Sequence, residues 1–244
     1  MNTLYAVFKL ARALLHILVG FFTILLVFPR LGAPQHQRRT QQWSLSMLRC
    51  IGIELIVKGD AAVRGPLLLV ANHMSWLDIT ALHAARFCRF VSKADIKKWP
   101  FIGMLASGIG TLFIERESRR DAMRVVHRMT DSLRAGDVLG VFPEGTTSDG
   151  SGLLPFHANL FQAAIAANAP VQPVALQFID TRTGQRSTAA CYINDDTLVG
   201  SVWRALTTPG LAVVITFGEP QWAEGRDRRA WALAMRQAVA DLRA

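Results

Sequence analysis

The sequence predicts an α/β fold in which a single mixed sheet is flanked by helices and preceded by an N-terminal helical segment. From Glu54 onward, short apolar runs alternate with helical patterns, as they do in layered α/β proteins. The first 53 residues differ in charge, because they hold six Lys and Arg residues and no Asp or Glu. We therefore expect an N-terminal segment of residues 1–53 and a sheet domain of residues 54–244.

Composition excludes several classes of protein. Hydrophobic residues make up 51% of the 244 residues and charged residues only 18%, which excludes a disordered chain. Cys50, Cys88 and Cys191 are far apart and odd in number, so neither a disulfide framework nor a paired-cysteine site is expected. A reducing compartment is favoured. The net charge is +9, but no zinc-finger, RNA-recognition or helix-turn-helix pattern is present, so we expect no nucleic-acid partner.

An uncharged apolar run from Ala13 to Pro29 lies between Arg12 and Arg30. Its 17 residues are at the short end of what crosses a membrane. A signal peptide is disfavoured, because no small-residue cleavage site follows the run. A buried core helix does not require cationic residues on both sides. The pattern therefore favours a helix that crosses a bilayer or enters one leaflet.

The stretch from Gln35 to Ile51 predicts a basic amphipathic helix. Trp43, Met47 and Ile51 recur every four residues and would form one apolar stripe. Basic helices with such a stripe lie on anionic membrane surfaces, so we expect this helix to do the same. The positive charge of Arg38 and Arg39 places this side of the membrane in the cytoplasm.

Within the sheet domain, continuous apolar runs predict buried strands, and apolar residues spaced three or four apart predict helices. The run from Leu67 to Ala71 follows Gly65-Pro66 and has the composition of a buried strand. Further strands are predicted at Phe87–Val91, Thr111–Ile114, Val138–Phe142, Val171–Phe178 and Ala212–Phe217. Helices are predicted at Ser75–Ala85, Asp121–Ala135, Leu160–Asn168 and Asp227–Leu242.

The helix over 121–135 is predicted from one apolar face and a stop signal. Met123, Val126, Thr130 and Leu133 would share that face, and Gly136 would end the helix. The strand at Val138–Phe142 is likewise ended by a proline at position 143.

The first candidate site follows the strand at Leu67–Ala71 and runs from Asn72 to Asp78. His73 and Asp78 are five residues apart, which on one helix would separate them by about 140°. They can meet only if His73 lies in the loop before the helix. Asp78 would then fix the imidazole tautomer and leave the other nitrogen able to take a proton. Alternatively, Ser75 and Asp78 form a helix capping box and His73 is an ordinary loop residue.

Two further candidate sites also follow strands. Arg116 follows the strand at Thr111–Ile114 and offers a planar fork suited to phosphate, although it could instead pair with a neighbouring glutamate. The second site is Phe142-Pro143-Glu144-Gly145-Thr146, where a proline ends the strand and a glycine permits a tight turn. Its hydroxyl and backbone N–H groups suit an anion, whereas the carboxylate of Glu144 would repel one. The same residues could form a plain polar turn.

Other catalytic and binding motifs are absent from the sequence. It contains no G-x-S-x-G elbow, P-loop, dinucleotide fingerprint or H-E-x-x-H, and no cluster with metal-ligand spacing. We therefore expect neither a metal nor a cofactor.

Taken in order, four blocks resemble the 1-acylglycerol-3-phosphate acyltransferase family. They are Asn72-His73 to Asp78, Gly110 with Phe113-Ile114 and Arg116, Phe142 to Thr146, and Pro170 to Val174. The resemblance spans residues 54–220 and extends to the apolar N-terminus. Relatives often have Phe-Lys where this chain has Phe156-His157, and the run from Thr147 to Gly150 is similar to relatives that acylate lyso-ornithine lipid.

The resemblance implies an O-acyltransferase in which His73 is the general base and Asp78 is its partner. The donor would be acyl-coenzyme A or acyl-acyl carrier protein, and the acceptor the hydroxyl of 1-acylglycerol 3-phosphate or of another lysolipid. Lys93 would stabilise the thioester oxyanion, and the other expected substrate-binding residues are Asn72, Gly110, Arg116, Glu144, Gly145 and Thr146.

The same resemblance leaves a non-catalytic lipid-binding protein as an alternative of another class. The intact His73 and Asp78 argue against it. The implied location is the cytoplasmic face of a bacterial inner membrane.

Overall fold

A computed structural model describes residues 3–62, 64–99, 102–114, 119–193 and 195–244. Within these residues, seven strands form one sheet in the order β1-β7-β6-β2-β5-β3-β4. The strands are β1 (Glu54–Lys58), β2 (Leu67–Ala71), β3 (Arg89–Lys93), β4 (Leu112–Ile114), β5 (Val138–Val141), β6 (Val171–Asp180) and β7 (Leu211–Phe217). Neighbouring strands are parallel except for the antiparallel pair β6 and β7. The predicted mixed α/β fold is confirmed.

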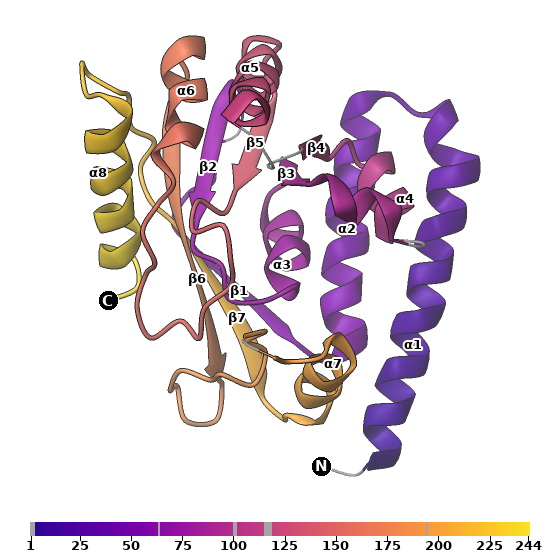
Figure 1. Cartoon of the computed structure of the whole chain (residues 1–244). Coiled ribbons are helices and arrows are strands. Elements are labelled where there is room, and N and C mark those ends of the chain that lie inside the picture. Colours follow the sequence, from indigo (N-terminus) through magenta and orange to yellow (C-terminus); the bar gives the residue numbers. More distant parts are fainter. Residues whose placement is uncertain (1–2, 63, 100–101, 115–118, 194) are drawn as a thin grey trace.

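Helices cover both faces of the sheet (Figure 1). On one face lie α1 (Thr3–Phe22), α2 (Ala33–Ile51), α3 (Leu77–Ala85) and α7 (Leu198–Thr207), with α4 (Ile102–Gly108) beside α1. On the other lie α5 (Arg119–Arg134), α6 (Phe161–Ala167) and α8 (Arg228–Asp241). Each face has its own apolar core. The central strand β2 is buried along its whole length and contributes to both.

The N-terminal helix is longer than the apolar run that predicted it. Its α-helical part continues through a π-helical turn and a 3₁₀ turn, so that residues Thr3–Arg30 form 28 helical residues, enough in length and composition to cross a membrane. The helix also includes the charged Lys9, whose side chain is buried against the protein. The Nζ of Lys9 donates to the carbonyl of Leu206, 3.3 Å away. The opposite face exposes large apolar side chains, among them Leu15, Leu18 and Leu25.

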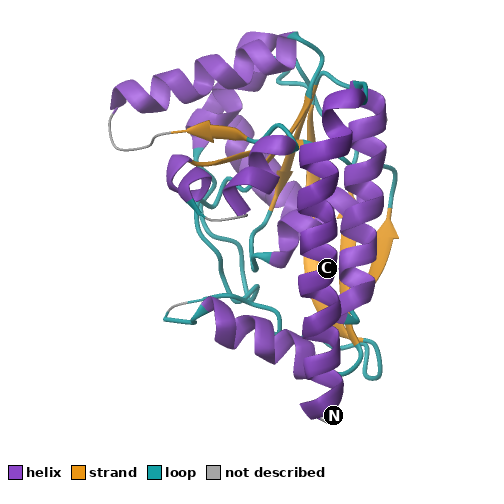
Figure 2. Ribbon diagram, turned by 90° about the vertical axis from the view of Figure 1, so that its right-hand side faces the viewer, coloured by secondary structure: helices purple, strands orange, loops and turns teal. Residues whose placement is uncertain are grey.

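Helix α2 forms as predicted, but its apolar stripe does not face a membrane. Met47 and Ile51 are buried in the core beneath α2. Trp43 packs against α1, where its ring stacks on His16 with centroids 4.9 Å apart and its Nε1 donates to the His16 carbonyl. Figures 1 and 2 show α1 and α2 side by side along their length. The stripe is therefore covered by protein, and α1 carries the exposed apolar surface.

Helix α5 also differs from its prediction. Met123 was expected on the buried face but is 75% exposed, whereas Val125, Met129 and Leu133 are buried. Of the other predicted face residues, Thr130 and Leu133 are buried and Val126 is packed against the core, so the predicted face was wrong at Met123 alone. No sequence pattern predicted β1, α4 or α7, which are short or half-exposed elements.

Candidate active site

The candidate residues gather at one edge of the sheet. Strands β2, β5, β3 and β4 are mutually parallel, so their carboxyl ends meet at the same edge. His73 lies two residues after β2, and Glu144 lies three residues after β5. The topology thus brings together two of the predicted motifs that are about 70 residues apart in the sequence.

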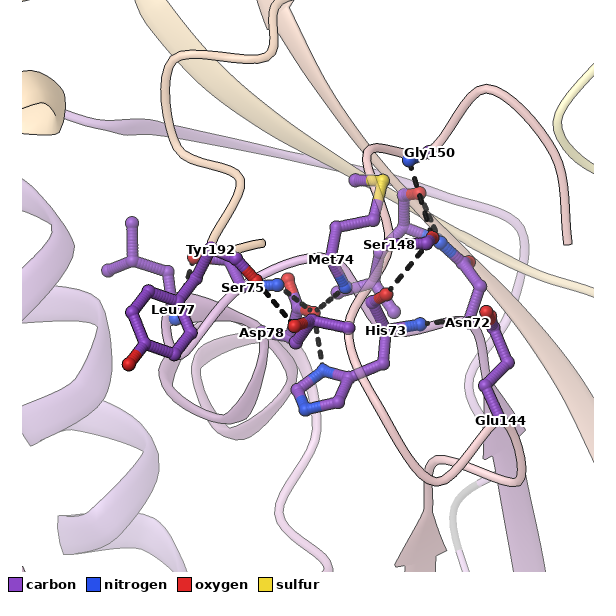
Figure 3. Close-up of polar contacts among 12 residues, drawn as sticks. Asn72, His73, Met74, Ser75, Leu77, Asp78, Glu144, Ser148, Gly150 and Tyr192 are labelled. Atoms are coloured by element: carbon purple, nitrogen blue, oxygen red, sulfur yellow. Dashed lines mark hydrogen bonds and ion pairs between the residues drawn. The ribbon is translucent and has the colours of Figure 1, made fainter. Parts of the chain in front are cut away.

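His73 and Asp78 form a hydrogen-bonded pair (Figure 3). Nδ1 of His73 lies 2.8 Å from Oδ2 of Asp78, and since a carboxylate can only accept, Nδ1 carries the proton. The same oxygen accepts from the backbone N–H groups of Met74 at 2.6 Å and Ser75 at 2.8 Å. The Asp78 side chain is fully buried. Asp78 therefore binds the backbone before α3 and orients the imidazole at once. Only half of the alternative capping box forms, because Ser75 Oγ accepts from the N–H of Leu77 and not from that of Asp78.

The His73 ring is fixed in place and remains accessible. It stacks on Phe142 with ring centroids 4.0 Å apart and an interplanar angle of 8°. Its side chain is 19% exposed, and Nε2 has no hydrogen-bond partner among the described residues. An imidazole with its Nδ1 proton held in this way can accept a proton at Nε2.

Glu144 supports the histidine loop from inside the protein. Its carboxylate accepts from the backbone N–H of His73 and from that of Leu154, both at 3.2 Å. The residue is only 5% exposed. Burial raises the pKa of the carboxyl above its ordinary value, and the two N–H donors act in the opposite direction. Glu144 thus ties the turn after β5 to the loop after β2.

Gly145 and Thr146 form the outer part of the same turn. Gly145 has φ +73°, and a Cβ placed there would lie 2.8 Å from Nε2 of His157. His157 therefore packs over the glycine, at the position where relatives often have lysine. Thr146 is exposed beside it. The turn requires glycine both for its backbone conformation and for this close contact.

A family model described as Acyltransferase matches residues 48–177, which include all of these residues. The chain belongs to the acyltransferase family.

Curated relatives divide between two acceptor lipids. The chain is 39% identical over 206 residues to the lyso-ornithine lipid O-acyltransferase of Pseudomonas aeruginosa, covering 84% of this chain and 78% of that protein. It is 39% identical over 189 residues to the 1-acyl-sn-glycerol-3-phosphate acyltransferase of Neisseria meningitidis, covering 76% and 73%. These relatives identify the chain as an O-acyltransferase of lysolipids.

A solved structure shares the fold. The 1-acyl-sn-glycerophosphate acyltransferase PlsC of Thermotoga maritima superposes with a TM-score of 0.68 over 97% of this chain and 98% of that one. Sequence identity in the superposition is 20%, so this comparison shows that the two proteins share a fold and shows nothing further.

Two further predicted residues have structural partners in this acyltransferase. Asn72 is 1% exposed, and its side chain accepts from the backbone N–H of Leu176 and donates to the carbonyl of the same residue. It joins the end of β2 to β6. Gly110 has φ +81°, and its carbonyl accepts from Nε of Arg89 at 2.8 Å. It turns the chain into β4 at the opposite edge of the sheet from His73.

Of the two predicted cationic residues, the structure describes the backbone of Lys93. Lys93 is the last residue of β3 and is in register with Ile114, the last residue of β4. Arg116 lies in the segment 115–118, outside the described residues, two positions after β4 ends. Among the described residues, no group of three or more His, Cys, Asp or Glu side chains could hold a metal ion.

Backbone contacts from other segments support the histidine loop, and no pattern in the sequence predicted them. Ser148 donates its backbone N–H to the His73 carbonyl at 2.9 Å, and the backbone N–H of Tyr192 donates to the Met74 carbonyl at 2.8 Å (Figure 3). Arg186 and Arg243 both donate to the carbonyl of Gly150. The family resemblance covered residues 148–150. No local sequence pattern indicates that the residues at 186, 192 and 243 contact this part of the protein.

Proposed function

We propose that this acyltransferase transfers a fatty acyl group from a thioester to the free hydroxyl of 1-acylglycerol 3-phosphate, which makes phosphatidic acid. The observation that carries the proposal is the His73–Asp78 pair, in which Nδ1 is bound to a buried carboxylate and Nε2 is accessible. This is the arrangement that a general base needs when the substrate supplies its own hydroxyl nucleophile.

In the proposed reaction, Nε2 of His73 takes the proton of the acceptor hydroxyl as that oxygen bonds to the thioester carbonyl carbon. Asp78 stabilises the imidazolium that forms. The carbon–sulfur bond then breaks, and the thiolate of the carrier leaves and takes the proton from the imidazolium. The carrier is coenzyme A or acyl carrier protein, and no covalent acyl-enzyme is required.

The remaining site residues are proposed to hold the two substrates. Arg116, with the exposed turn at Gly145 and Thr146, would bind the acceptor phosphate, because guanidinium and backbone N–H groups bind phosphate well. Lys93 would stabilise the oxyanion of the thioester. Since the carboxylate of Glu144 is used inside the protein, we assign this residue to positioning His73.

Lyso-ornithine lipid is the second candidate acceptor. The Pseudomonas relative carries that activity in its name. In addition, a hollow of about 480 Å³ is lined by Asp195, Asp196 and Arg204 and flanks Tyr192, which contacts the histidine loop. Arg204 is already paired with Asp196, so Asp195 is the lining charge that remains, and it suits the ammonium of an ornithine headgroup.

The N-terminal helix and the relatives in lipid synthesis indicate membrane association. We propose that residues 1–53 seat the protein on the cytoplasmic face of the bacterial inner membrane, with residues 54–244 carrying out catalysis. Helix α1 would then lie with its exposed apolar face in one leaflet, because its other face packs on α2.

The test offers lysophosphatidate and lyso-ornithine lipid separately to the purified protein, each with acyl-coenzyme A and with acyl-acyl carrier protein, and identifies the lipid product by mass spectrometry. His73→Ala should lower kcat by about 10²–10⁴ with either donor. Asp78→Asn should lower it less, because an imidazole remains, although in the wrong tautomer. His127→Ala, an exposed histidine on α5, is the matched control and should keep full activity.

Three outcomes would change the proposal. A product only from lyso-ornithine lipid would replace the first acceptor by the second. His73→Ala with more than a tenth of the wild-type rate would remove the general-base assignment. No product from any combination would favour a non-catalytic lipid-binding protein.

A further inference from the structure

The opposite edge of the sheet holds a cavity that the acyl-transfer proposal does not use. It has a volume of about 450 Å³ and lies between the first two turns of α2, the end of α4 and the turns that precede β2 and β5. Gly65 lines it, whereas His73 follows β2 at the other edge. Eight residues of extended chain separate the two positions by about 25 Å. The cavity is therefore separate from the candidate active site.

The lining of the cavity is positively charged. The cavity is lined by three arginines, Arg64, Arg86 and Arg89. Among the described residues that line it, one is acidic, Asp137. Asp137 is already paired with Arg89. Arg64 is exposed and has no hydrogen-bond or ion-pair partner among the described residues, so its guanidinium is available to an anion.

A buried hydroxyl in the lining is also available to a ligand. Thr40, on α2, is 5% exposed, and its Oγ1 has no hydrogen-bond partner among the described residues. Leaving a buried hydroxyl without a partner is unfavourable, and such groups in native proteins usually have one. An oxygen of a bound anion would accept from it.

The cavity adjoins the end of the apolar N-terminal helix. His36 lines it, and Nε2 of His36 contacts the carbonyl of Phe28 at 2.7 Å, at the end of that helix. Gly108 also lines it, and a Cβ placed on Gly108 would lie 2.4 Å from the Ile24 side chain. Leu25, next to Ile24, is exposed. A lipid with its headgroup in the cavity would thus find an apolar helix surface for its chains.

From this lining we infer that the cavity binds a phosphate group, separately from the acyl-transfer site. Arginine forks recognise phosphate oxygens by paired hydrogen bonds, and basic pockets beside membrane helices hold phospholipid headgroups. The phosphate is supplied by an anionic phospholipid of the membrane or as the free ion. Both sources share the chemistry of the site, and the test separates them.

The test measures binding by calorimetry with the full chain in a neutral detergent. The two probes are inorganic phosphate and a short-chain phosphatidylglycerol below its micelle concentration. Arg64→Gln removes an exposed lining charge, and Thr40→Val removes the hydroxyl with little change of shape. Arg38→Gln is the matched control, because it makes the same charge change on α2 without lining the cavity. Any binding at the acyl-transfer site is common to all four proteins and does not affect the comparison.

Arg64→Gln should weaken binding at least about tenfold, the loss typical of one charged hydrogen bond. Thr40→Val should weaken it about threefold while leaving the Tm unchanged, since the hydroxyl has no partner within the described protein. Arg38→Gln should bind like the wild type. Phosphatidylglycerol binding at least tenfold tighter than inorganic phosphate identifies the lipid as the source, and equal affinities identify the free ion.

Two results would overturn the inference. Equal affinities of the wild type and all three variants would show that the cavity binds neither probe. Loss of acyl transfer in Arg64→Gln, measured in the same detergent, would show that the cavity is not separate from the active site.

Discussion

His73 is held by three groups from two segments of the chain, the start of α3 and the turn after β5. Asp78 binds its Nδ1, Phe142 stacks on its ring, and Glu144 accepts from its backbone N–H. Only the contact with Asp78 is local in sequence. A side chain fixed in this way loses little further freedom on reaching a transition state, as the general-base role that we propose for His73 requires.

Glu144 gives this arrangement a testable dependence on pH. Burial raises the pKa of its carboxyl in the folded protein, so between its ordinary and its raised pKa the native state binds more protons than the unfolded state. The contribution of Glu144 to stability is therefore fully present below its ordinary pKa and is lost as the pH rises through the raised pKa. Glu144→Gln cannot titrate, and its curve of unfolding free energy against pH should lack this decline.

The measurement is urea unfolding at a series of pH values above pH 4, for the wild type and for Glu144→Gln. The difference between the two free energies should change across that window. Two parallel curves would mean that the carboxyl titrates alike in the folded and unfolded states.

Asn72 illustrates a residue whose role the sequence could not predict. The resemblance placed it among the substrate-binding residues, but both polar atoms of its side chain bind the backbone of Leu176. Asn72→Ala would leave a buried N–H and a buried carbonyl without partners. We expect a loss of about 2–4 kcal/mol in the free energy of unfolding, measured by denaturant titration. A variant with wild-type stability and a raised KM would restore the substrate-binding role.

Local spacing explains which parts of the site were predictable. The five-residue spacing allows His73 to meet Asp78 only from the loop before α3, and the structure places His73 there, with Asp78 in the first turn of the helix. The position of Glu144 against the His73 backbone depends on β2 and β5 being neighbours, and no local pattern carries that information.

At the scale of elements, α1 carries the largest exposed apolar surface of the protein. Substituting Leu15 and Leu18 by Asp places two charges on that surface without touching the core. We expect the double variant to move from the membrane fraction to the supernatant, because a charge at the bilayer interior costs several kcal/mol. Leu233→Asp, an exposed leucine on α8, should stay in the membrane fraction.

High salt should not extract the wild type, since hydrophobic burial is not screened. Complete release by salt would make the attachment electrostatic. Full membrane retention of the double variant would place the attachment elsewhere than the exposed face of α1.

Strong apolar patterns predicted the central strands and helices. Elements with weak apolar patterns, such as β1 and α7, were not predicted. β2 is buried on both sides and reads as an uninterrupted apolar run, so its existence and ends follow from the sequence. β1 is an edge strand with exposed residues, and α7 has an exposed tryptophan, so their patterns resemble loops. Met123 fits a helical repeat but is exposed near the start of α5, where the buried side chain is that of Val125.

For the molecule as a whole, the N-terminal segment divides into two parts with different roles. Helix α2 buries Met47, Leu48 and Ile51 in the core, whereas the buried apolar side chains of α1 are the small Ala6 and Ala13, with Leu10 and Ile17 partly buried beside them. Removing residues 1–30 should therefore leave a folded domain. Removing residues 1–53 exposes the core and deletes apolar contacts of about 5–9 kcal/mol, comparable to the whole stability of a domain.

Circular dichroism of the two truncated proteins tests this difference. A cooperative thermal transition should survive the first truncation and vanish in the second. A folded protein after the longer truncation would make α2 dispensable to the core.

The strand order was the least predictable property of the molecule. Alternation of strands and helices indicates a mostly parallel sheet, yet β6 and β7 pair in opposite directions, with α7 and a long connection between them. A connection that contains a helix usually joins parallel strands, so no local pattern indicates the antiparallel pairing of β6 and β7.

The contact between Lys9 and the carbonyl of Leu206 joins groups 197 positions apart. A ribosome makes α1 first, and most of the chain must follow before its docking surface on α7 exists. During that interval the leucines of α1 have the bilayer as their apolar partner. If α1 seats in the membrane as proposed, it would arrive there before the sheet has formed, and the catalytic domain would complete its folding already at the surface where its substrates are found.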